Sequence, residues 1–282
     1  MFPQALRTSL ERTIGTRIIA GAPLNGGSIN SAMKLEGETE NYFLKWNDAD
    51  RFPGMFEAEA KGLQLLADNS TFCVPQFTAC GTVENTSYLL LEFLDKGQVD
   101  WESAGIALAN MHRQPAEKFG LDHDNYIGSL RQINTQHATW SDFFANERIL
   151  LQVQLAVEKN LLTRMDRYRA ENFCTCIDEL FPKEAPALLH GDLWNGNFMF
   201  TKKGPSIYDP AVYYGHREMD LAMTKLFGGF DAEFYEAYND IFPLEKNWQQ
   251  RISYCNLYPL LVHVNLFGGG YVNEVRSILE KF

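Results

Sequence analysis

The 282-residue chain lacks the features of several protein classes. It has five cysteines, an odd number, and no pair of them is spaced as C-x-x-C. This argues against a disulfide framework or a zinc site, and we expect reduced thiols and a cytoplasmic location. No basic-then-apolar signal pattern opens the sequence. The apolar run at residues 257–267 is interrupted by His263 and Asn265 and is too short to cross a membrane, so we expect no membrane contact.

Positive charge is also scarce. The chain has 25 Lys and Arg residues against 36 Asp and Glu residues, which gives a net charge of −11 and a pI near 5.0. Nucleic-acid binding depends on cations that neutralise phosphates, so this balance disfavours it. It would tolerate a cationic small molecule, although a soluble surface alone explains it. There is no internal repeat or low-complexity segment, and the length suits two lobes around a cleft.

The most informative stretch is residues 190–197, which reads HGDLWNGN and is followed twelve residues later by Asp209. Asp192 precedes Asn197 by five positions, the spacing of the kinase catalytic loop H-R-D-x-x-x-x-N. In such sites one carboxylate accepts the proton of the attacking hydroxyl, while an amide oxygen and a second carboxylate hold Mg²⁺ on ATP. We therefore predict Asp192 as the catalytic base and Asn197 and Asp209 as Mg²⁺ ligands. The alternative is an ordinary buried turn built from Asp, Asn and Gly.

The role of His190, the first residue of this motif, is less certain. His190 could be a second candidate base, but a base must reach the acceptor hydroxyl, and Asp192 already occupies that position in the motif. We therefore expect the His190 ring to hold the loop in shape.

A phosphate-binding region is predicted near the N-terminus. Gly26, Gly27 and Ser28 precede two alternating strands, at residues 29–35 and 42–46, and glycines let a backbone approach phosphate oxygens. This is not a full G-x-G-x-x-G, and a Gly-Gly pair by itself indicates only a turn. Lys45 lies inside the second strand, where a lysine needs a partner or a ligand. We predict that Lys45 contacts the ATP phosphates; the alternative is a lysine facing water on an edge strand.

A partner for Lys45 is available on the next element. Apolar residues at helical spacing predict a helix over residues 56–69, with Glu57 and Glu59 on it. Side chains two residues apart on a helix point about 200° apart around its axis, so only one of these two glutamates can face the strand. We predict Glu59, because it lies nearer the apolar face, and a Lys–Glu pair of this kind positions the lysine in kinases.

The boundary between the lobes is predicted after the next buried strand, at residues 88–95. In a kinase layout this strand leads to the hinge, whose backbone groups at Glu92, Phe93 and Leu94 would hydrogen-bond adenine. We expect a nucleotide-binding lobe at residues 1–95 and a catalytic and substrate-binding lobe at residues 96–282.

The second lobe reads as mostly helical. Apolar periodicity predicts helices in ranges 103–113, 140–173, 218–227, 232–241 and 248–267. Residues 119–139 are polar and predict a substrate-side loop or insertion, with a length that suggests function or mobility. Arg217 and Glu218 read as a surface pair.

Nearly the whole chain, from about residue 15 to the end, resembles the fructosamine kinase (ketosamine-3-kinase) family, a branch of the aminoglycoside-phosphotransferase-like kinases. Two motifs are the most specific, His-Gly-Asp-Leu-Trp at residues 190–194 and Tyr-Gly-His at residues 214–216. The other matching segments are Gly26-Gly27-Ser28-Ile29-Asn30, Phe56-Glu57-Ala58-Glu59, Phe119-Gly120, Trp140-Ser141-Asp142-Phe143-Phe144, Tyr208-Asp209-Pro210-Ala211 and Leu226-Phe227-Gly228-Gly229-Phe230.

The resemblance implies an α+β, bilobal, protein-kinase-like fold, with a small β-rich N-terminal lobe carrying one main helix and a larger, mostly helical C-terminal lobe. It implies ATP and Mg²⁺ as cofactors, and Asp220 as a brace of the catalytic loop. Trp194 is either core or a residue that stacks on the sugar. His216 either lines the acceptor pocket or caps the following helix. Ser28 stands where some relatives carry a cysteine, so their redox regulation is not expected here.

The activity implied is ATP-dependent phosphorylation of a ketosamine at the sugar 3-hydroxyl, in deglycation repair. Ribulosamine, erythrulosamine and fructosamine adducts, free or on protein, are the expected substrates, and the chain is expected to be a monomer or weak dimer. One alternative is a phosphotransferase of the same fold that acts on an aminoglycoside, choline or another small alcohol. Another is a nucleotide-binding pseudokinase, which the filled motif positions disfavour. The chain differs from protein kinases, since Asp209-Pro210-Ala211 replaces Asp-Phe-Gly and Ala-Pro-Glu is missing.

Overall fold

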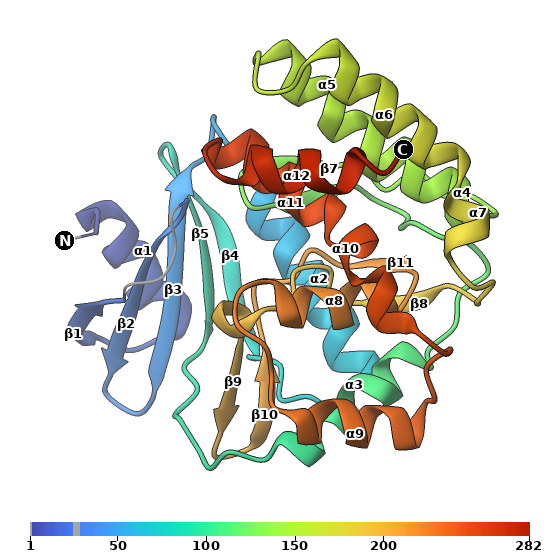
Figure 1. The fold of residues 1–282 in the computed structure, drawn as a ribbon. Helices are drawn as coiled ribbons and strands as arrows, with labels where there is room; N and C mark the ends of the chain where they lie inside the picture. Colours follow the sequence, from blue (N-terminus) through green and yellow to red (C-terminus); the bar gives the residue numbers. More distant parts are fainter. Residues whose placement is uncertain (1, 25–28) are drawn as a thin grey trace.

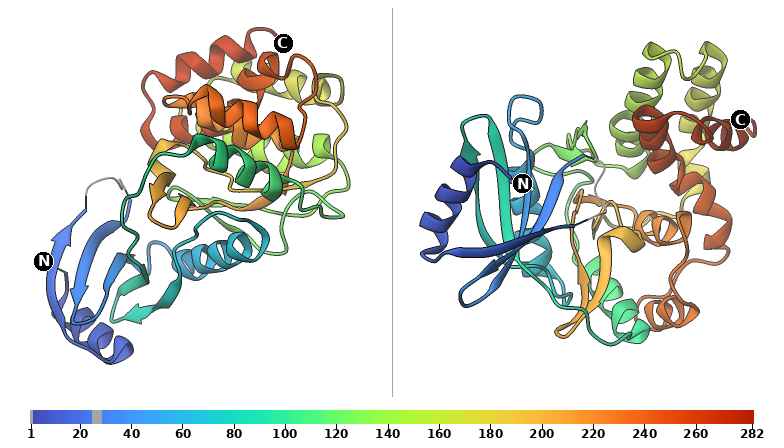
Figure 2. Two further views of the ribbon diagram at one scale, coloured as in Figure 1. Left: turned by 90° about the horizontal axis from the view of Figure 1, so that it is seen from below. Right: turned by 90° about the vertical axis from the view of Figure 1, so that its left-hand side faces the viewer.

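A computed structural model describes residues 2–24 and 29–282, and these form two lobes (Figures 1 and 2). The small lobe contains a five-stranded antiparallel sheet with strand order β1-β2-β3-β5-β4. The larger lobe is mostly helical, as the sequence predicts. Gly26, Gly27 and Ser28 lie outside the described residues, so their predicted contact with phosphates stays a prediction. In the part of the chain that is described, no helix combines the length and apolarity needed to cross a membrane.

Helices cover both faces of the small sheet. Its strands are β1 (Ile18–Pro23), β2 (Ser31–Gly37), β3 (Asn41–Asp48), β4 (Phe77–Val83) and β5 (Thr86–Glu92). On one face, helix α1 (Gln4–Ile14) packs Leu6 and Leu10 into a cluster that includes Leu90. On the other face, helix α2 (Met55–Asn69) packs against Leu89 and Leu91. Strand β5 is therefore a continuous apolar run because both of its faces are buried.

The sheet register explains where Lys45 points. Lys45 of β3 lies directly opposite Leu89 of β5, and residues opposite each other in an antiparallel pair share a face. Leu89 faces α2, so Lys45 faces the same helix.

The large lobe contains the remaining elements. Its strands are β6 (Asn125–Ile127), β7 (Leu130–Gln132), β8 (Ala187–Leu189), β9 (Phe198–Thr201), β10 (Gly204–Ile207) and β11 (Tyr213–Gly215). Its helices are α3 (Trp101–His112), α4 (Trp140–Phe143), the π-helix η1 (Phe144–Leu150), α5 (Leu151–Glu158), α6 (Arg164–Thr175), α7 (Ile177–Leu180), the 3₁₀ helix η2 (Asn195–Asn197), α8 (Glu218–Leu226), α9 (Ala232–Ile241), the 3₁₀ helix η3 (Trp248–Arg251), α10 (Ile252–Cys255), α11 (Leu257–Phe267) and α12 (Tyr271–Leu279).

The expected helix over residues 140–173 is two helical stretches. The first runs from α4 through η1 to α5, and α6 starts anew after Thr163. The Thr163 hydroxyl accepts from the Asp166 N–H at 3.2 Å, and Asp166 accepts from the Thr163 N–H at 2.8 Å. This reciprocal capping fixes the start of α6.

Helix α2 joins the two lobes. Leu63 packs on the small sheet, whereas Leu66 belongs to a core that includes Leu108 and Ile207 of the large lobe. A Cβ added at Gly62 would lie 3.1 Å from Val212 Cγ2, so the glycine permits this close approach.

The polar segment 119–139, expected as a loop or insertion on the substrate side, contains the short β6–β7 hairpin. Three of its polar side chains, Asn125, Gln132 and Asn134, are buried. Asn125 donates to the Val212 carbonyl at 2.8 Å, and Gln132 donates to the Ala211 carbonyl at 3.1 Å. Buried carbonyl groups need hydrogen-bond donors, and these side chains supply them to the backbone that follows Asp209.

Candidate active site

The catalytic loop, residues 190–197, connects β8 to β9, ends in η2 and is anchored from α8. Asp220 accepts hydrogen bonds from the His190 N–H at 2.8 Å and from the Gly191 N–H at 2.9 Å. It is 1% exposed, so these charge-assisted bonds lie in a low-dielectric interior, where they are strong. The expectation that Asp220 braces the loop backbone is confirmed.

Asn197 fixes the orientation of Asp192. Its Nδ2 donates to both the carbonyl and the Oδ2 of Asp192 at 2.9 Å. Burial, and then the nearby charge of Asp209, raise the pKa of Asp192 to about 7, although the bond from Asn197 acts in the opposite direction. A carboxyl with a pKa near neutrality is well matched to accepting a hydroxyl proton.

Asp209 sits in a strained turn just after β10. Its φ is 56°, in the left-handed region, which costs a residue other than glycine about 1–3 kcal/mol. His190 holds this turn from both sides: its Nε2 bonds the Tyr208 carbonyl at 3.0 Å, and its carbonyl accepts from the Ala211 N–H at 2.9 Å. The ring of His190 is fully buried, so the structural role expected for it is confirmed.

Lys45 connects the two lobes at this point. Its Nζ lies 2.9 Å from Glu59 Oε1 on α2 and also pairs with Asp209 of the large lobe. Glu59 therefore forms the ion pair, and Glu57 is exposed. Burial would lower the pKa of Lys45, but the two carboxylates raise it, so the amine is fully charged. The roles of Lys45 and Glu59 toward ATP stay predictions.

The pKa values of the two carboxyls diverge. Burial raises the pKa of Glu59 to about 7, against the lowering effect of Lys45. For Asp209 burial acts in the same direction, but Lys45 outweighs it and lowers the pKa. The Asp209 side chain is 39% exposed, which makes it the carboxylate open to a ligand.

The donors around Asp209 fit Mg²⁺. Asn197 uses its Nδ2 within the loop, and its Oδ1 accepts no hydrogen bond from the described residues. That oxygen and the Asp209 carboxylate are hard ligands from only two residues, and Mg²⁺ usually takes few ligands from protein and completes its shell with phosphates and water.

The predicted hinge follows β5. The Glu92 N–H donates to the Gln76 carbonyl at 2.9 Å, and the Phe93 N–H donates to the Asn41 carbonyl at 3.2 Å. The Leu94 N–H has no acceptor among the described residues, so of these three donors it is the one open to adenine. The side chain of Glu92 pairs with Lys203. Adenine binding by Glu92, Phe93 and Leu94 stays a prediction.

The two predicted substrate residues have different surroundings. Trp194 is partly exposed in the catalytic loop and packs edge-on against Phe227, with ring centroids 5.7 Å apart. His216 is 1% exposed and packs between Trp140 and Phe181. Its Nδ1 accepts from the Glu218 N–H at 3.4 Å, at the start of α8. The His216 ring therefore lies in the core beside the start of α8, and substrate contacts by Trp194 and His216 stay predictions.

The sequence analysis missed several buried residues behind the loop. His112 of α3 bonds Asp220 Oδ2 at 3.2 Å and Tyr238 Oη at 2.9 Å. Arg217 and Glu218, expected as a surface pair, are both buried: Arg217 pairs with Glu184 at 2.8 Å and Glu218 with Arg251 at 2.5 Å. Their sequence positions carry no local signal, since each partner lies more than 30 residues away.

The fold and the loop motif together define the class. A solved aminoglycoside phosphotransferase, APH(4)-Ia, matches with a TM-score of 0.62 over 98% of both chains, at 15% identity. The crystal structure of a fructosamine-3-kinase candidate from Thermobifida fusca matches with a TM-score of 0.86 at 35% identity, covering 99% of this chain and 100% of the other. The molecule is a kinase of the protein-kinase-like fold.

Comparison with related sequences shows to which family of kinases the chain belongs. The model of the family "Fructosamine kinase" matches residues 2–282, so the chain belongs to the fructosamine kinase family and is an ATP-dependent kinase. A probable ketoamine kinase of Enterococcus faecium is 42% identical over 92% of this chain and 94% of its own. The chloroplastic protein-ribulosamine 3-kinase of Arabidopsis thaliana is 34% identical over 95% of this chain and 83% of its own.

Proposed function

We propose that this protein phosphorylates ketosamines at the sugar 3-hydroxyl, with ATP as the donor, as a step of deglycation repair in the cytoplasm. The observation that carries the proposal is the cluster of Asp192, Asn197, Asp209 and Lys45, brought together from both lobes. The family and the names of the ketoamine and ribulosamine kinases support the substrate class.

In this proposal Asp192 accepts the proton of the acceptor hydroxyl. Asn197 holds its carboxylate in one orientation, so the oxygen that faces the hydroxyl is already placed before the substrate binds. The transition state of phosphoryl transfer is loose, and positioning therefore contributes as much as basicity.

Lys45 and Asp209 act on the phosphates. Lys45 pairs with Asp209 and with Glu59, and we infer that its charged amine would contact the phosphates of bound ATP. Glu59 would orient Lys45 for this contact, since it holds the amine from the side of α2. Bound Mg²⁺ would neutralise the charge on the ATP phosphates, with Asn197 and Asp209 as its protein ligands.

A turnover assay tests the proposal. The purified protein is incubated with ATP, Mg²⁺ and, in parallel, a ribulosamine, an erythrulosamine, a fructosamine, an aminoglycoside and choline, and ADP release is measured. We expect turnover with at least one ketosamine and none with the other two classes. Turnover of the aminoglycoside or choline alone would indicate a different acceptor, and ATP binding without turnover of any acceptor would indicate a pseudokinase.

A further inference from the structure

Arg148 is a buried cation without a carboxylate partner. It lies in the π-helix η1 and is 0% exposed. Among the described residues its hydrogen bonds go to the carbonyls of Ile133 at 2.6 Å and Glu147 at 3.0 Å and to Oδ1 of Asn134 at 2.7 Å. Three aromatic rings, with centroids 4.1, 4.5 and 5.2 Å from the guanidinium, supply only part of what a counter-charge would. A buried charge without an ion pair is costly, so Arg148 has a role that an apolar side chain of its size cannot fill.

Arg148 determines the direction of a row of buried amide groups. A guanidinium can only donate, so it requires the oxygen of Asn134 on its side and turns the Nδ2 of that amide away. This Nδ2 donates to Oδ1 of Asn125 at 3.0 Å, and Nε2 of Gln132 donates to the same oxygen at 2.7 Å. The Nδ2 of Asn125 is therefore left to donate to the Val212 carbonyl at 2.8 Å.

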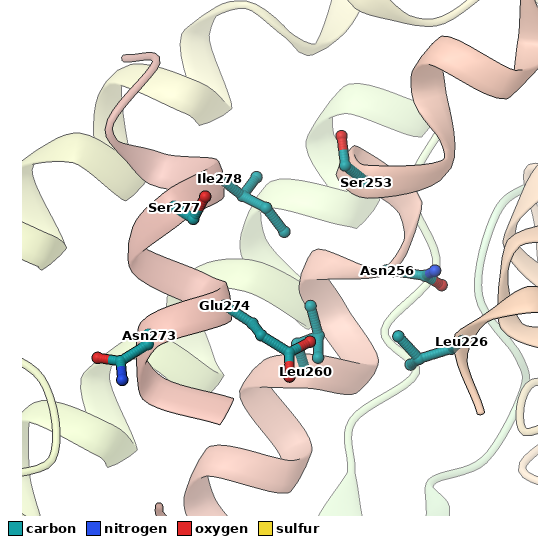
Figure 3. A pocket seen from close by; sticks show the side chains of 8 residues that line it. All are labelled: Leu226, Ser253, Asn256, Leu260, Asn273, Glu274, Ser277 and Ile278. Carbon is teal, nitrogen blue, oxygen red and sulfur yellow. The ribbon is translucent and has the colours of Figure 1, made fainter. Parts of the chain in front are cut away.

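Gln132 forms a second branch, and Tyr258 orients it. The Tyr258 hydroxyl donates to Oε1 of Gln132 at 2.7 Å, so the Nε2 faces Ala211 and donates to its carbonyl at 3.1 Å. Tyr258 is buried, whereas Leu260, two residues later on α11, borders a surface groove (Figure 3). The side chains of Arg148, Asn134, Asn125 and Gln132 thus form one amide relay, which ends at two successive backbone carbonyls.

The relay ends on the turn that carries Asp209. Asp209 has a φ of 56° and is followed by Pro210, although residues before proline prefer extended conformations. A strained conformation of this kind persists only where its surroundings hold it. On one side the carbonyl of His190 accepts from the Ala211 N–H, and on the other side the relay binds the carbonyls of Ala211 and Val212. The backbone just after Asp209 is therefore fixed from both sides.

We propose that Arg148 is a positioning residue for the Mg²⁺ site: through the amide relay it holds the turn after Asp209, so that the Asp209 carboxylate is placed before metal and nucleotide bind. This rests on the metal ligation proposed above for Asp209. With an apolar residue at position 148 the amides could rotate, and the two carbonyls would lose donors of fixed direction. Partners outside the ligand set adjust metal affinity in this way without touching the metal.

The test is the gain in nucleotide affinity that Mg²⁺ produces. Calorimetric titration gives the Kd of the non-hydrolysable analogue AMP-PNP without and with Mg²⁺, and the ratio of these two values is compared among variants. Arg148→Met and Asn125→Leu should each reduce the ratio by about tenfold. The Kd without metal should stay at the parent's value, because Lys45 and the segment after β5 lie outside the relay. The double variant should lose little more than Asn125→Leu alone, since both substitutions interrupt one relay.

Asn265→Leu is the matched control. Asn265 is a buried amide of α11 whose Nδ2 donates to the carbonyl and to Oε1 of Gln152, both at 2.9 Å, so its loss removes two buried hydrogen bonds outside the relay. It should lower the melting temperature and keep the parent's ratio. Asn134→Leu, which interrupts the relay next to Arg148, should reduce the ratio as Arg148→Met does and takes its place if that variant does not fold.

The inference is overturned if the relay variants keep the parent's ratio, if Asn265→Leu reduces it equally, or if the two single losses add in the double variant. Asp209→Ala separates these outcomes from a failure of the metal site itself. If the parent gains no affinity from Mg²⁺, or if Asp209→Ala keeps the gain, the proposed ligation fails, and this inference fails with it. If only Asp209→Ala loses the gain, the metal site stands and the role of Arg148 is refuted.

Discussion

Asp192 and Asp209 are two carboxyls of one site whose pKa values are moved in opposite directions. Asp192 has no cation partner among the described residues, and burial and the charge of Asp209 raise its pKa to about 7. Asp209 pairs with the charged amine of Lys45, which lowers its pKa in spite of burial. Divergent environments of this kind favour different roles for two acids, and they support the proposed proton acceptor at Asp192 and metal ligand at Asp209.

Replacing the proposed base should slow the chemical step of turnover without weakening ATP binding. Asp192→Asn keeps the shape of the side chain and removes the proton acceptor, so kcat should fall by about 10²–10⁴-fold while ATP affinity stays close to the parent's. Steady-state kinetics measures kcat, and calorimetric titration measures ATP affinity. Asp240→Asn, at an exposed position of α9, is the control. Loss of ATP binding with an unchanged kcat would make Asp192 a nucleotide or metal ligand instead.

The same substitution should change how stability depends on pH. The pKa of Asp192 is raised on folding, so its contribution to the free energy of unfolding is fully present below about pH 4 and is lost as pH rises through about 7. Asp192→Asn stays neutral at every pH. Without nucleotide and metal, the variant should therefore gain about 2–4 kcal/mol over the parent between pH 4 and pH 8. Urea unfolding at several pH values measures this gain, and parallel curves for the two proteins would contradict it.

At the scale of elements, the β8–loop–η2–β9 segment is positioned by helices distant in sequence. Asp220 of α8 holds the loop backbone, His112 of α3 bonds Asp220, and Tyr238 of α9 bonds His112 from its other ring nitrogen. The sequence predicts the loop and α8, because both carry local motifs and periodicity. It does not predict His112, whose contacts depend on how α3, α8 and α9 pack.

The difference between local sequence signals and contacts made by packing also explains which other residues could be placed from the sequence. Glu59 could be chosen over Glu57 from helix phase alone, since the partner lay on a neighbouring strand. His216 could not be placed, because a histidine after two tyrosines fits a pocket and a core equally well. The buried contacts of segment 119–139 could not be predicted, because its donors serve carbonyls at residues 211–212, a requirement visible only in the fold.

Weakening the hydrogen bonds between Asp220 of α8 and the catalytic loop should reduce activity, because the loop would be held less precisely. Asp220→Asn has one acceptor oxygen in place of two, so one of the bonds to His190, Gly191 or His112 is lost, at about 1.5–3 kcal/mol. We expect kcat to fall by about 10–100-fold and the melting temperature to fall by several degrees. Asp231→Asn, which retains the cap of α9, should change neither. Unaltered kcat in a destabilised Asp220→Asn would show that the brace serves folding alone.

At the scale of the whole molecule, the site exists only where the lobes meet. Lys45 comes from the small sheet and Asp209 from the large lobe, and α2 packs on both (Figure 1). The linker that follows β5 also pairs with the β9–β10 hairpin, through Gly97 N–H to the Phe200 carbonyl at 2.9 Å. Contacts on two sides thus fix the position of Lys45 relative to Asp192 and Asp209.

Removing the cation between the lobes should impair catalysis far more than stability. Lys45→Ala leaves Glu59 unpaired, but Glu59 already has a pKa of about 7 and can become neutral, which limits the loss of stability. We expect kcat/KM for ATP to fall by at least about 100-fold, with a decrease of only a few degrees in melting temperature. Lys61→Ala, on the exposed face of α2, is the control. A variant that keeps near-parental turnover would place Lys45 outside the phosphate site.

The central claim is that this cluster transfers a phosphoryl group from ATP to the 3-hydroxyl of a ketosamine. The most direct measurement is the position of phosphate on the sugar after turnover of a ribulosamine with ATP and Mg²⁺, determined by ³¹P and ¹H NMR, with Asp209→Ala in parallel. The account predicts a 3-phosphate from the parent and no product from the variant, which remains folded. Phosphate at another hydroxyl, or a 3-phosphate formed at the parental rate by Asp209→Ala, would contradict it.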